Sequence, residues 1–238
     1  MIAGVFFILI TLTTVLALPL HDTSNSPKAK RDTSDLRTRL RNANTAVERT
    51  LILSENGNAS FAFDFNNPPN GSASVFPTGK LVKANIATFP ALTGVSSSLV
   101  VATVGPCGVV APHVHPRGDE FLVVSEGRLF TQFLSETGSV LVTNELQTYV
   151  GTVFPKGSIH FEYNPDCTEA KFIAAFNDND AGSTLVAPAF FSLEDGSVLT
   201  ALGGMAMFPD TGLDSVRQSM PRTAIYGVQS CMAQCGIK

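Results

Sequence analysis

The 238-residue chain carries a formal net charge of −4, with 15% charged residues, 17 phenylalanines and no tryptophan. No basic stripe runs along it, which argues against nucleic-acid binding, because such proteins gather Lys and Arg on one face. The length accommodates one core of about 130–150 residues with extensions.

Residues 1–17 are predicted to form a secretory signal peptide that is cut after Ala17. An apolar stretch from Val5 to about Leu12 precedes the small-residue pattern of Val15 and Ala17, as in cleaved signals. The apolar run is nearly long enough to act as a membrane anchor instead, but its threonines and its cleavage-like end favour removal. We expect a secreted, extracellular protein, free or attached to the cell wall, with no membrane segment after cleavage.

A propeptide or N-terminal extension is expected over residues 18–55. Within it, Lys30-Arg31 is either a proprotein-convertase site or a solvated charge pair, and the sequence leaves both interpretations open. His21 is given no role. The spacing of apolar residues in Asp35–Leu53, opened by a Ser34-Asp35 cap, predicts one short amphipathic helix that packs on the main domain or on a neighbouring subunit.

Two glycosylation acceptor triplets follow, each beside residues that favour turns. They are Asn58-Ala59-Ser60 and Asn70-Gly71-Ser72. In a secreted chain we expect Asn58 and Asn70 to carry glycans.

From residue 79 onward, short apolar stretches with strand-like alternation dominate the sequence, separated by turn signals such as Thr93-Gly94 and Thr137-Gly138. The expected strands cover residues 80–89, 97–104, 107–115, 120–124, 129–134, 139–143, 147–153, 158–163 and 170–176. Strands at this close spacing, without long helices, predict an all-β sandwich or barrel, which we assign to residues 56–195. The tail, residues 196–238, is expected to be helical, with short helices within 190–204 and 209–221.

Three of the four histidines and one glutamate form a candidate metal site. His113 and His115 are two residues apart, so on a strand both rings point to the same face. A turn at residues 116–118 lets Glu120, which opens the next strand, face back toward them. His160 lies on a strand that follows a second turn containing Pro and Gly.

Three neutral imidazoles and one carboxylate suit a divalent transition ion such as manganese, iron, nickel, copper or zinc. On an octahedral ion, four protein ligands leave two positions open for water, oxygen or a small substrate. The sequence therefore predicts His113, His115, Glu120 and His160 as metal ligands, and no separate acid–base residue is evident beside them.

These residues fall in two motifs that resemble those of the cupin family. The motif residues are His113, His115, Glu120 and Gly127, followed by Pro155, Gly157, His160 and Asn164. The segment P-H-V-H-P-R-G-D-E is similar to germins and spherulins, and the flanking segments resemble secreted fungal spherulin-type germin-like proteins. The resemblance covers roughly residues 60–205. It implies a jelly-roll barrel with a metal inside, usually manganese, and a helical tail that clasps a neighbouring subunit in a homo-oligomer.

Three positions depart from the family pattern. Cys107 and Tyr149 stand where each motif usually opens with glycine. Val110 stands where oxalate-oxidising germins have an asparagine that helps to hold substrate. An apolar side chain cannot make that hydrogen bond, so weak or absent oxalate oxidation is expected.

Four cysteines in a secreted chain predict two disulfides, with three pairings available. Cys107 lies just before the first motif strand and Cys167 just after the second, and both motifs converge on one metal. We therefore expect a Cys107–Cys167 bridge, which leaves Cys231–Cys235 as a local bridge in the tail.

Three classes of function fit this sequence. The first is a metal-dependent oxidoreductase that acts on superoxide or on a small oxygen-bearing substrate. The second is a non-catalytic glycoprotein of the wall, the spore or the stress state, and the third is a cupin isomerase, cyclase or dioxygenase of a biosynthetic pathway. One fold and one metal cage serve many chemistries, so the sequence leaves open whether the chain is an enzyme.

Overall fold

A computed structural model describes the protein over residues 33–203, 212–220 and 225–237. The expected signal peptide, His21 and the Lys30-Arg31 pair lie outside these residues. Among the helices of the described residues, none is long and apolar enough to cross a membrane.

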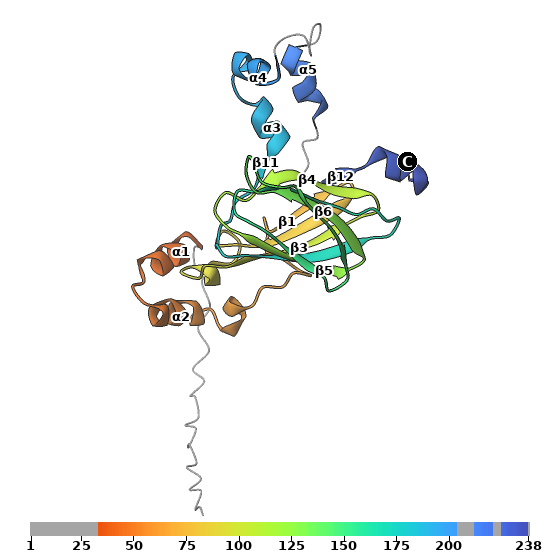
Figure 1. Cartoon of the computed structure of the whole chain (residues 1–238). Helices are drawn as coiled ribbons and strands as arrows, with labels where there is room; N and C mark the ends of the chain where they lie inside the picture. Colours follow the sequence, from red (N-terminus) through yellow and green to blue (C-terminus); the bar gives the residue numbers. More distant parts are fainter. Residues whose placement is uncertain (1–32, 204–211, 221–224, 238) are drawn as a thin grey trace, which may run out of the picture.

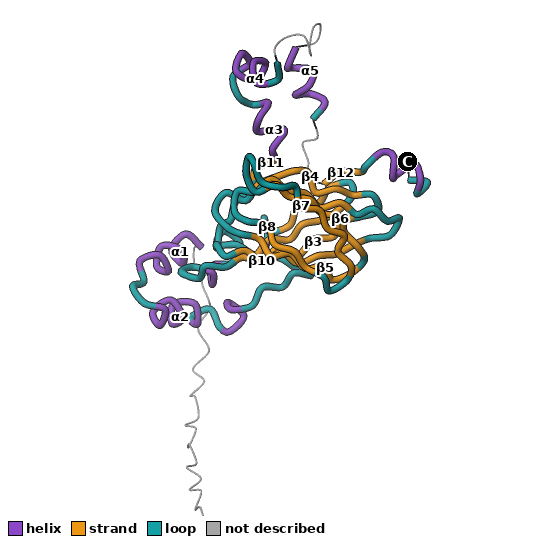
Figure 2. Tube along the Cα trace, viewed as in Figure 1, coloured by secondary structure: helices purple, strands orange, loops and turns teal. Residues whose placement is uncertain are grey.

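Two antiparallel β-sheets face each other and form a barrel (Figure 1; strands orange in Figure 2). The first sheet has the order β1 (Ala73–Phe76), β2 (Gly79–Ala84), β3 (Ser98–Val104), β10 (Ala170–Phe176), β5 (Glu120–Glu126) and β8 (Gly151–Phe154). The second has the order β11 (Thr184–Leu185), β4 (Gly108–Val114), β9 (Ile159–Tyr163), β6 (Arg128–Leu134) and β7 (Val142–Gln147), and β12 (Ile225–Gly227) also pairs with β4. This architecture confirms the predicted all-β jelly-roll class.

Three short strands, β1, β11 and β12, lie outside the stretches that the sequence predicted. Another expected strand is shorter than predicted, because β2 ends at Ala84 and Asn85 opens a turn. The Asn85 side-chain oxygen accepts hydrogen bonds from the N–H groups of Ala87 (3.1 Å) and Thr88 (3.2 Å). Such local bonds compete with the ladder of a sheet.

The inner faces of the two sheets pack through alternating apolar residues. On β10, Phe172 and Phe176 are buried, whereas Ile173 is 40% exposed on the outer face. Fully burying one such phenylalanine stabilises the fold by about 1.5–3 kcal/mol. The cluster also contains Leu81, Ala102, Val104, Val110, Leu122, Val124, Leu129, Leu146, Phe154, Ala170, Ala174, Ala181 and Ile225.

Two helices, not one, form the N-terminal extension in the described residues. The predicted single helix was wrong, because α1 (Thr33–Asn42) ends before α2 (Ala46–Ser54) begins. The break lies at Thr45, whose side chain accepts from the Glu48 N–H (3.1 Å) while the Glu48 carboxylate accepts from the Thr45 N–H (3.2 Å). This capping box starts a new helix. Two short 3₁₀ helices follow, at Asn58–Phe61 and Pro90–Leu92.

The C-terminal part of the chain, from residue 186 onward, contains the two expected helices together with two more. Helices α4 (Asp195–Ala201) and α5 (Gly212–Ser219) fall in the predicted ranges, and α3 (Val186–Phe191) and α6 (Gln229–Gln234) are additional. The Arg217 guanidinium on α5 links the three helices α3, α4 and α5. It donates to the Phe191 carbonyl at the end of α3 (2.7 Å) and to the Asp195 carboxylate at the start of α4 (2.6 Å). Figure 1 shows α3, α4 and α5 projecting from the barrel.

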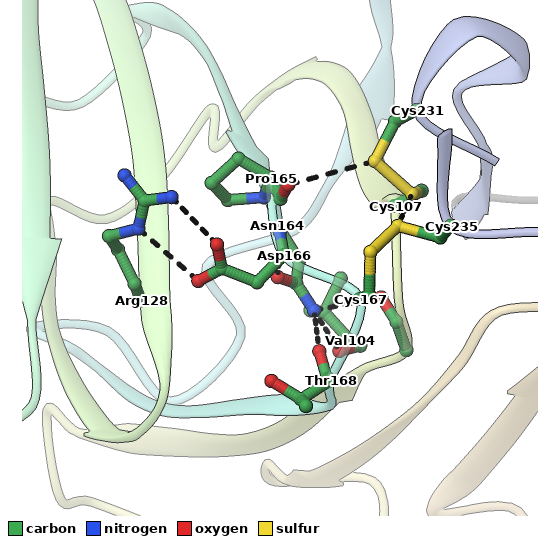
Figure 3. The surroundings of a disulfide bond; sticks show 11 residues. Val104, Cys107, Arg128, Asn164, Pro165, Asp166, Cys167, Thr168, Cys231 and Cys235 are labelled. Carbon is green, nitrogen blue, oxygen red and sulfur yellow. Dashed lines mark hydrogen bonds and ion pairs between the residues drawn. A yellow bond between two sulfur atoms is a disulfide. The ribbon is translucent and has the colours of Figure 1, made fainter. Parts of the chain in front are cut away.

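All four cysteines form disulfides, but the predicted pairing was wrong. The bridges are Cys107–Cys231 and Cys167–Cys235 (Figure 3). The two loop cysteines are neighbours as expected, since the Cys107 N–H donates to the Asp166 carbonyl (3.2 Å). Cys231 lies on helix α6 and Cys235 caps its C-terminal end about one turn later, so each sulfur reaches a different loop cysteine.

Candidate metal centre

The four predicted ligands meet inside the barrel. His113 on β4 and His160 on β9 are paired across the two strands, His115 follows β4, and Glu120 opens β5. One donor atom from each lies within 4.8 Å of all the others, and all four side chains are buried. The fold thus brings together every residue that the sequence proposed as a ligand.

The spacing of the donor atoms fits a single ion. The Glu120 Oε2 atom lies 2.9 Å from His115 Nε2 and 3.3 Å from His160 Nε2. His113 Nε2 lies 3.1 Å from His115 Nε2. Two donors at about 2.1 Å from one ion are about 3.0 Å apart at a right angle and about 3.4 Å apart in a tetrahedron. These three separations, 2.9 to 3.3 Å, lie close to this range.

Backbone carbonyls fix the orientation of each imidazole through its Nδ1 atom. The carbonyl partners are Ala111 for His113 (3.0 Å), Gly182 for His115 (2.5 Å) and Ser158 for His160 (2.9 Å). An Nδ1–H that donates to a carbonyl leaves the Nε2 lone pair free. The three Nε2 lone pairs therefore point toward one another.

This arrangement calls for a cation. The Nε2 atoms of His113 and His115 face each other without a proton between them, because both protons are on Nδ1. His160 Nε2 and Glu120 Oε2 are buried and have no hydrogen-bond donor. Buried acceptors without a donor are costly, and a divalent ion would satisfy all of them at once. The four residues therefore fit a bound divalent metal.

The protonation states also suit a metal. The pKa of His113 is lowered from 6.5 to about 3, mainly by burial and further by His160 and His115. Burial alone would raise the pKa of Glu120, but the adjacent imidazoles of His115 and His160 outweigh burial and lower that pKa. At neutral pH His113 is thus uncharged and Glu120 is an anion, as ligation requires.

Two phenylalanines that the sequence did not single out hold the imidazoles in place. Phe154 stacks on His160 with ring centroids 4.3 Å apart and an angle of 16° between the planes. Phe176 meets His115 edge to face at 4.7 Å. These contacts restrict rotation of the two ligand rings, in addition to their carbonyl bonds.

Asp119 joins three loops around the centre and was also missed. Its carboxylate accepts from the Lys156 N–H (2.8 Å) and from the Asn177 side chain (2.6 Å). The Lys156 turn leads into β9, and the neighbouring Gly157 N–H donates to the His115 carbonyl (2.9 Å). The loop beside Glu120 is thereby locked to the turn that precedes His160.

Asn164, the last motif residue, is structural. Its buried side-chain amide donates to the carbonyls of Val104 (3.0 Å), Gly105 (2.9 Å) and Thr168 (2.7 Å), as Figure 3 shows in part. Its side-chain oxygen accepts from the Asp166 N–H (3.0 Å). One side chain thus fastens the loop after β9 to the end of β3.

A cavity of about 270 Å³ is lined by His113, His115 and Glu120. Its buried wall is mainly apolar and includes Leu81, Ala84, Val110, Phe172, Ala174, Phe176 and Ala181. Lys83, Asn85, Asp180 and Ser183, which are more exposed, also line it. A small molecule in this cavity would lie against the candidate ligands.

Glu162 is a buried carboxyl in the wall of the same cavity, 1% exposed. Burial and the charge of Glu120 raise its pKa well above the usual value. It follows His160 by two residues on β9, so both side chains point into the barrel. That alternation could have identified Glu162 from the sequence, but Glu162 is not one of the residues of the two motifs.

The other predicted modification sites lie away from this centre. Asn58 and Asn70 are both exposed, Asn58 at the start of a 3₁₀ helix and Asn70 in the turn before β1. Both side chains are accessible to a glycosylating enzyme.

Comparison with solved structures supports the fold. An oxalate oxidase in complex with the substrate analogue glycolate matches with a TM-score of 0.60 and 22% identity, over 70% of this chain and 83% of that one. At this identity the match concerns the fold alone.

Sequence comparison gives the relationship. Spherulin-1A of Physarum polycephalum is 32% identical over 202 residues, which are 85% of this chain and 79% of the relative. A germin-like protein of Arabidopsis thaliana, subfamily 2 member 3, is 37% identical over 108 residues, which are 45% of this chain and 49% of the relative. The family model for cupins matches residues 61–201. The chain therefore belongs to the cupin family, as a homologue of the spherulins and the germin-like proteins.

Proposed function

We propose that this protein is a secreted, metal-dependent cupin that acts as an oxidoreductase on superoxide or on another small oxygen-bearing molecule. The observation that carries the proposal is the meeting of three Nε2 lone pairs and one carboxylate oxygen at the wall of a small cavity. A bound redox-active divalent ion supplies one-electron chemistry and polarises a ligand oxygen. The protein's part is to hold that ion, to keep its ligands deprotonated and to limit what reaches it.

Manganese is the proposed ion, on the strength of the family resemblance. The donor set of His113, His115, His160 and Glu120 also suits iron, nickel, copper and zinc. Copper and zinc bind such sites more tightly than manganese in a simple mixture. The metal should therefore be measured in protein that has not been reloaded.

Secretion and self-association complete the proposal. Two disulfides support an oxidising compartment, and the accessible Asn58 and Asn70 are compatible with glycans. Helices α3, α4 and α5 extend away from the barrel and offer a surface to a second copy of the chain. We therefore propose a homo-oligomer built through the tail.

The test combines metal analysis with assays on one sample. The full chain would be expressed with its own N-terminus, purified from the medium and analysed for metals by mass spectrometry. We expect about one divalent ion per chain and superoxide dismutation. Both should be lost in the double variant His113→Ala/His160→Ala and kept in Glu145→Gln, which changes an exposed glutamate on β7.

Two outcomes would change the assignment. Full metal occupancy in the double variant would remove these residues as ligands. A full complement of metal without turnover of superoxide would favour a non-catalytic wall, spore or stress glycoprotein. Oxalate serves as a negative control, because Val110 is buried in the cavity wall and offers no hydrogen bond to a carboxylate.

A further inference from the structure

The two disulfides lie in contact with each other. The Cys235 sulfur of one bridge is 3.5 Å from the Cys107 sulfur of the other (Figure 3). The sulfurs of Cys107, Cys231 and Cys235 all lie within 4.8 Å of one another. Disulfides exchange when a thiolate attacks a disulfide sulfur. A Cys235 thiolate would therefore already be beside a sulfur that it can attack.

The two bridges differ in their access to solvent. In the inner bridge, Cys107 is 0% and Cys231 is 5% exposed, so a reagent in solution cannot reach it. In the outer bridge, Cys167 is exposed and Cys235 is half-buried. Because exchange requires access to the attacked sulfur, a thiol in solution attacks the outer bridge first, at Cys167. Attack at Cys167 makes Cys235 the leaving group.

We propose that Cys167 is a site of attack by dithiols and that Cys235 then opens the inner bridge. In the first step a thiolate of the dithiol bonds to the Cys167 sulfur, and Cys235 leaves with the electron pair. In the second step the Cys235 thiolate bonds to the Cys107 sulfur. Cys231 leaves with the electron pair of the inner bridge and takes up a proton from water.

The second thiol group of the dithiol completes the reaction. It bonds to the first sulfur of the dithiol and releases Cys167 as a thiol. The dithiol loses two electrons and becomes a disulfide, and the protein gains the same two electrons. Two protein disulfides thus become one, Cys107–Cys235, together with the thiols of Cys167 and Cys231.

The end of helix α6 favours Cys107 over Cys231 as the target. The Cys235 N–H donates to the Cys231 carbonyl (2.9 Å), so the two residues are one helical turn apart. Residues at this spacing have Cβ atoms about 5–6 Å apart, whereas a disulfide needs about 3.5–4.5 Å. Opening the outer bridge frees rotation about the Cα–Cβ bond of Cys235, so its sulfur can turn into line with the inner bridge.

The fold also accommodates the thiol that is released. The Cys231 sulfur lies 3.7 Å from the Pro165 carbonyl oxygen, to which a Cys231 S–H group can donate. A buried neutral thiol otherwise packs as a small apolar side chain. The old and new bridges span 124 and 128 residues, so the exchange leaves the chain entropy of the unfolded state nearly unchanged.

The exchange keeps the tail linked to the barrel. Strand β12 pairs with β4, and the Val228 N–H donates to the Cys107 carbonyl (2.9 Å). With a Cys107–Cys235 bridge in place, the loop before β4 stays bonded to the end of α6 although one disulfide has been lost. The accessible bridge is therefore consumed in place of the link to the strand that carries His113.

The experiment treats the oxidised, full-length protein with one equivalent of dithiothreitol. Samples are quenched in acidic denaturant, alkylated there with a maleimide and mapped without reduction. We expect a Cys107–Cys235 link and label on Cys167 and Cys231. Label on Cys231 should exceed label on Cys235 by at least about threefold, because one weak S–H···O hydrogen bond supplies that factor. Protein unfolded in urea before the treatment is the control and should show no such preference.

Two matched variants test the second step without a reductant. Cys167→Ser leaves Cys235 without its partner, so the purified variant should contain the Cys107–Cys235 link and a Cys231 thiol. Cys235→Ser leaves Cys167 without its partner instead, and it should keep the Cys107–Cys231 bridge. Both variants lack the outer bridge, so a loss of stability that they share cannot produce the difference.

Other products would overturn the proposal. Label on Cys167 and Cys235, or an intact inner bridge in Cys167→Ser, would mean that the outer bridge opens without exchange. Label on Cys107 and Cys231 alone would mean that the inner bridge is attacked first, and a Cys231–Cys235 link would identify a different target. Resistance of both bridges to dithiothreitol would exclude Cys167 as a site of attack.

Discussion

Cys107 and Tyr149 adopt a left-handed backbone, with φ of 58° and 65°. They are the non-glycine residues with positive φ among the described residues, and both stand where cupin motifs usually have glycine. A Cβ atom makes this conformation unfavourable by about 1–2 kcal/mol. The left-handed backbone therefore explains why the family usually has glycine at these two positions. At Cys107 a side chain is nevertheless needed, because it forms the disulfide to Cys231.

Replacing Tyr149 by glycine should stabilise the protein. The side chain is 84% exposed, so little packing is lost, while the left-handed strain is removed. After allowance for the greater freedom of glycine in the unfolded chain, we expect a gain of about 0.5–1 kcal/mol. Urea unfolding of Tyr149→Gly measures it. The control Val150→Gly, at a neighbour without positive φ, should be destabilised; a loss of stability in Tyr149→Gly would show that the ring has contacts in solution.

Changing Glu120 to glutamine should weaken metal binding while preserving the shape of the site. The substitution removes the one negative charge among the four donors but leaves an oxygen in place. Because changes even to groups behind metal ligands cost 10–100-fold in affinity, we expect a loss of at least about 100-fold here. Competition with a metal-binding dye measures the dissociation constant. Glu145→Gln should have no effect, and equal affinity in the two variants would exclude Glu120 as a ligand.

At the scale of single residues, the sequence predicted those site residues whose positions follow spacing rules. His113, His115, Glu120 and His160 fall in a local pattern, and the barrel brought them within 4.8 Å. Asp119 and Phe154 could not be predicted in the same way, since their partners come from loops and strands that only the fold brings close.

At the scale of elements, the segment from β12 to α6 was the least predictable part. Strand β12 has only three residues, too few for an alternation to be recognised, and its partner β4 lies more than 100 residues earlier in the chain. Ile225 on β12 is nevertheless fully buried in the core. The wrong disulfide pairing has the same cause, because it assumed a tail independent of the barrel.

Removing the tail bridges should therefore loosen the barrel itself. Peptide mapping without reduction should link Cys107 to Cys231 and Cys167 to Cys235. In the chain-entropy model, bridges that span 124 and 68 residues contribute up to about 5 and about 4 kcal/mol. The double variant Cys107→Ser/Cys231→Ser should unfold at lower urea concentration and exchange the amide hydrogens of β4 faster. Unchanged exchange in β4 would mean that α6 does not brace the metal-bearing strand.

At the scale of the whole molecule, three buried groups set how the stability of the metal-free protein depends on pH. His113 has a pKa of about 3 in the fold against 6.5, so stability falls as pH drops below about 6.5, where only the unfolded chain takes up the proton. Glu120 has a lowered pKa, so its contribution is lost as pH falls below about 4.5. Glu162 has a raised pKa, so stability falls as pH rises above about 4.5.

Together the three groups predict that the stability of the metal-free protein has a plateau in pH and declines more steeply on its acidic limb than on its alkaline limb. Between about pH 4.5 and 6.5 the effects of His113 and Glu162 cancel. Below the plateau the unfolded chain binds two more protons than the folded protein, so stability falls by about 2.7 kcal/mol for each unit by which the pH drops. Above the plateau the folded protein retains one more proton than the unfolded chain, so stability falls by about 1.4 kcal/mol for each unit by which the pH rises. Urea titrations of chelator-treated protein from pH 3 to 9 measure the profile. Glu162→Gln should abolish the alkaline limb, and a wild-type profile that rises steadily to pH 9 would contradict the assignment of these three groups.

The neighbours of β4 become available at different moments of protein synthesis. Strand β9 is made first, β11 about twenty residues later, and β12 only near the end of the chain. A chain still short of residue 225 leaves residues 108–110 of β4 unpaired on that edge, although β11 already pairs with His113 and Val114. Closure of this edge of the barrel therefore waits for residues 225–227, which are made about forty residues after β11.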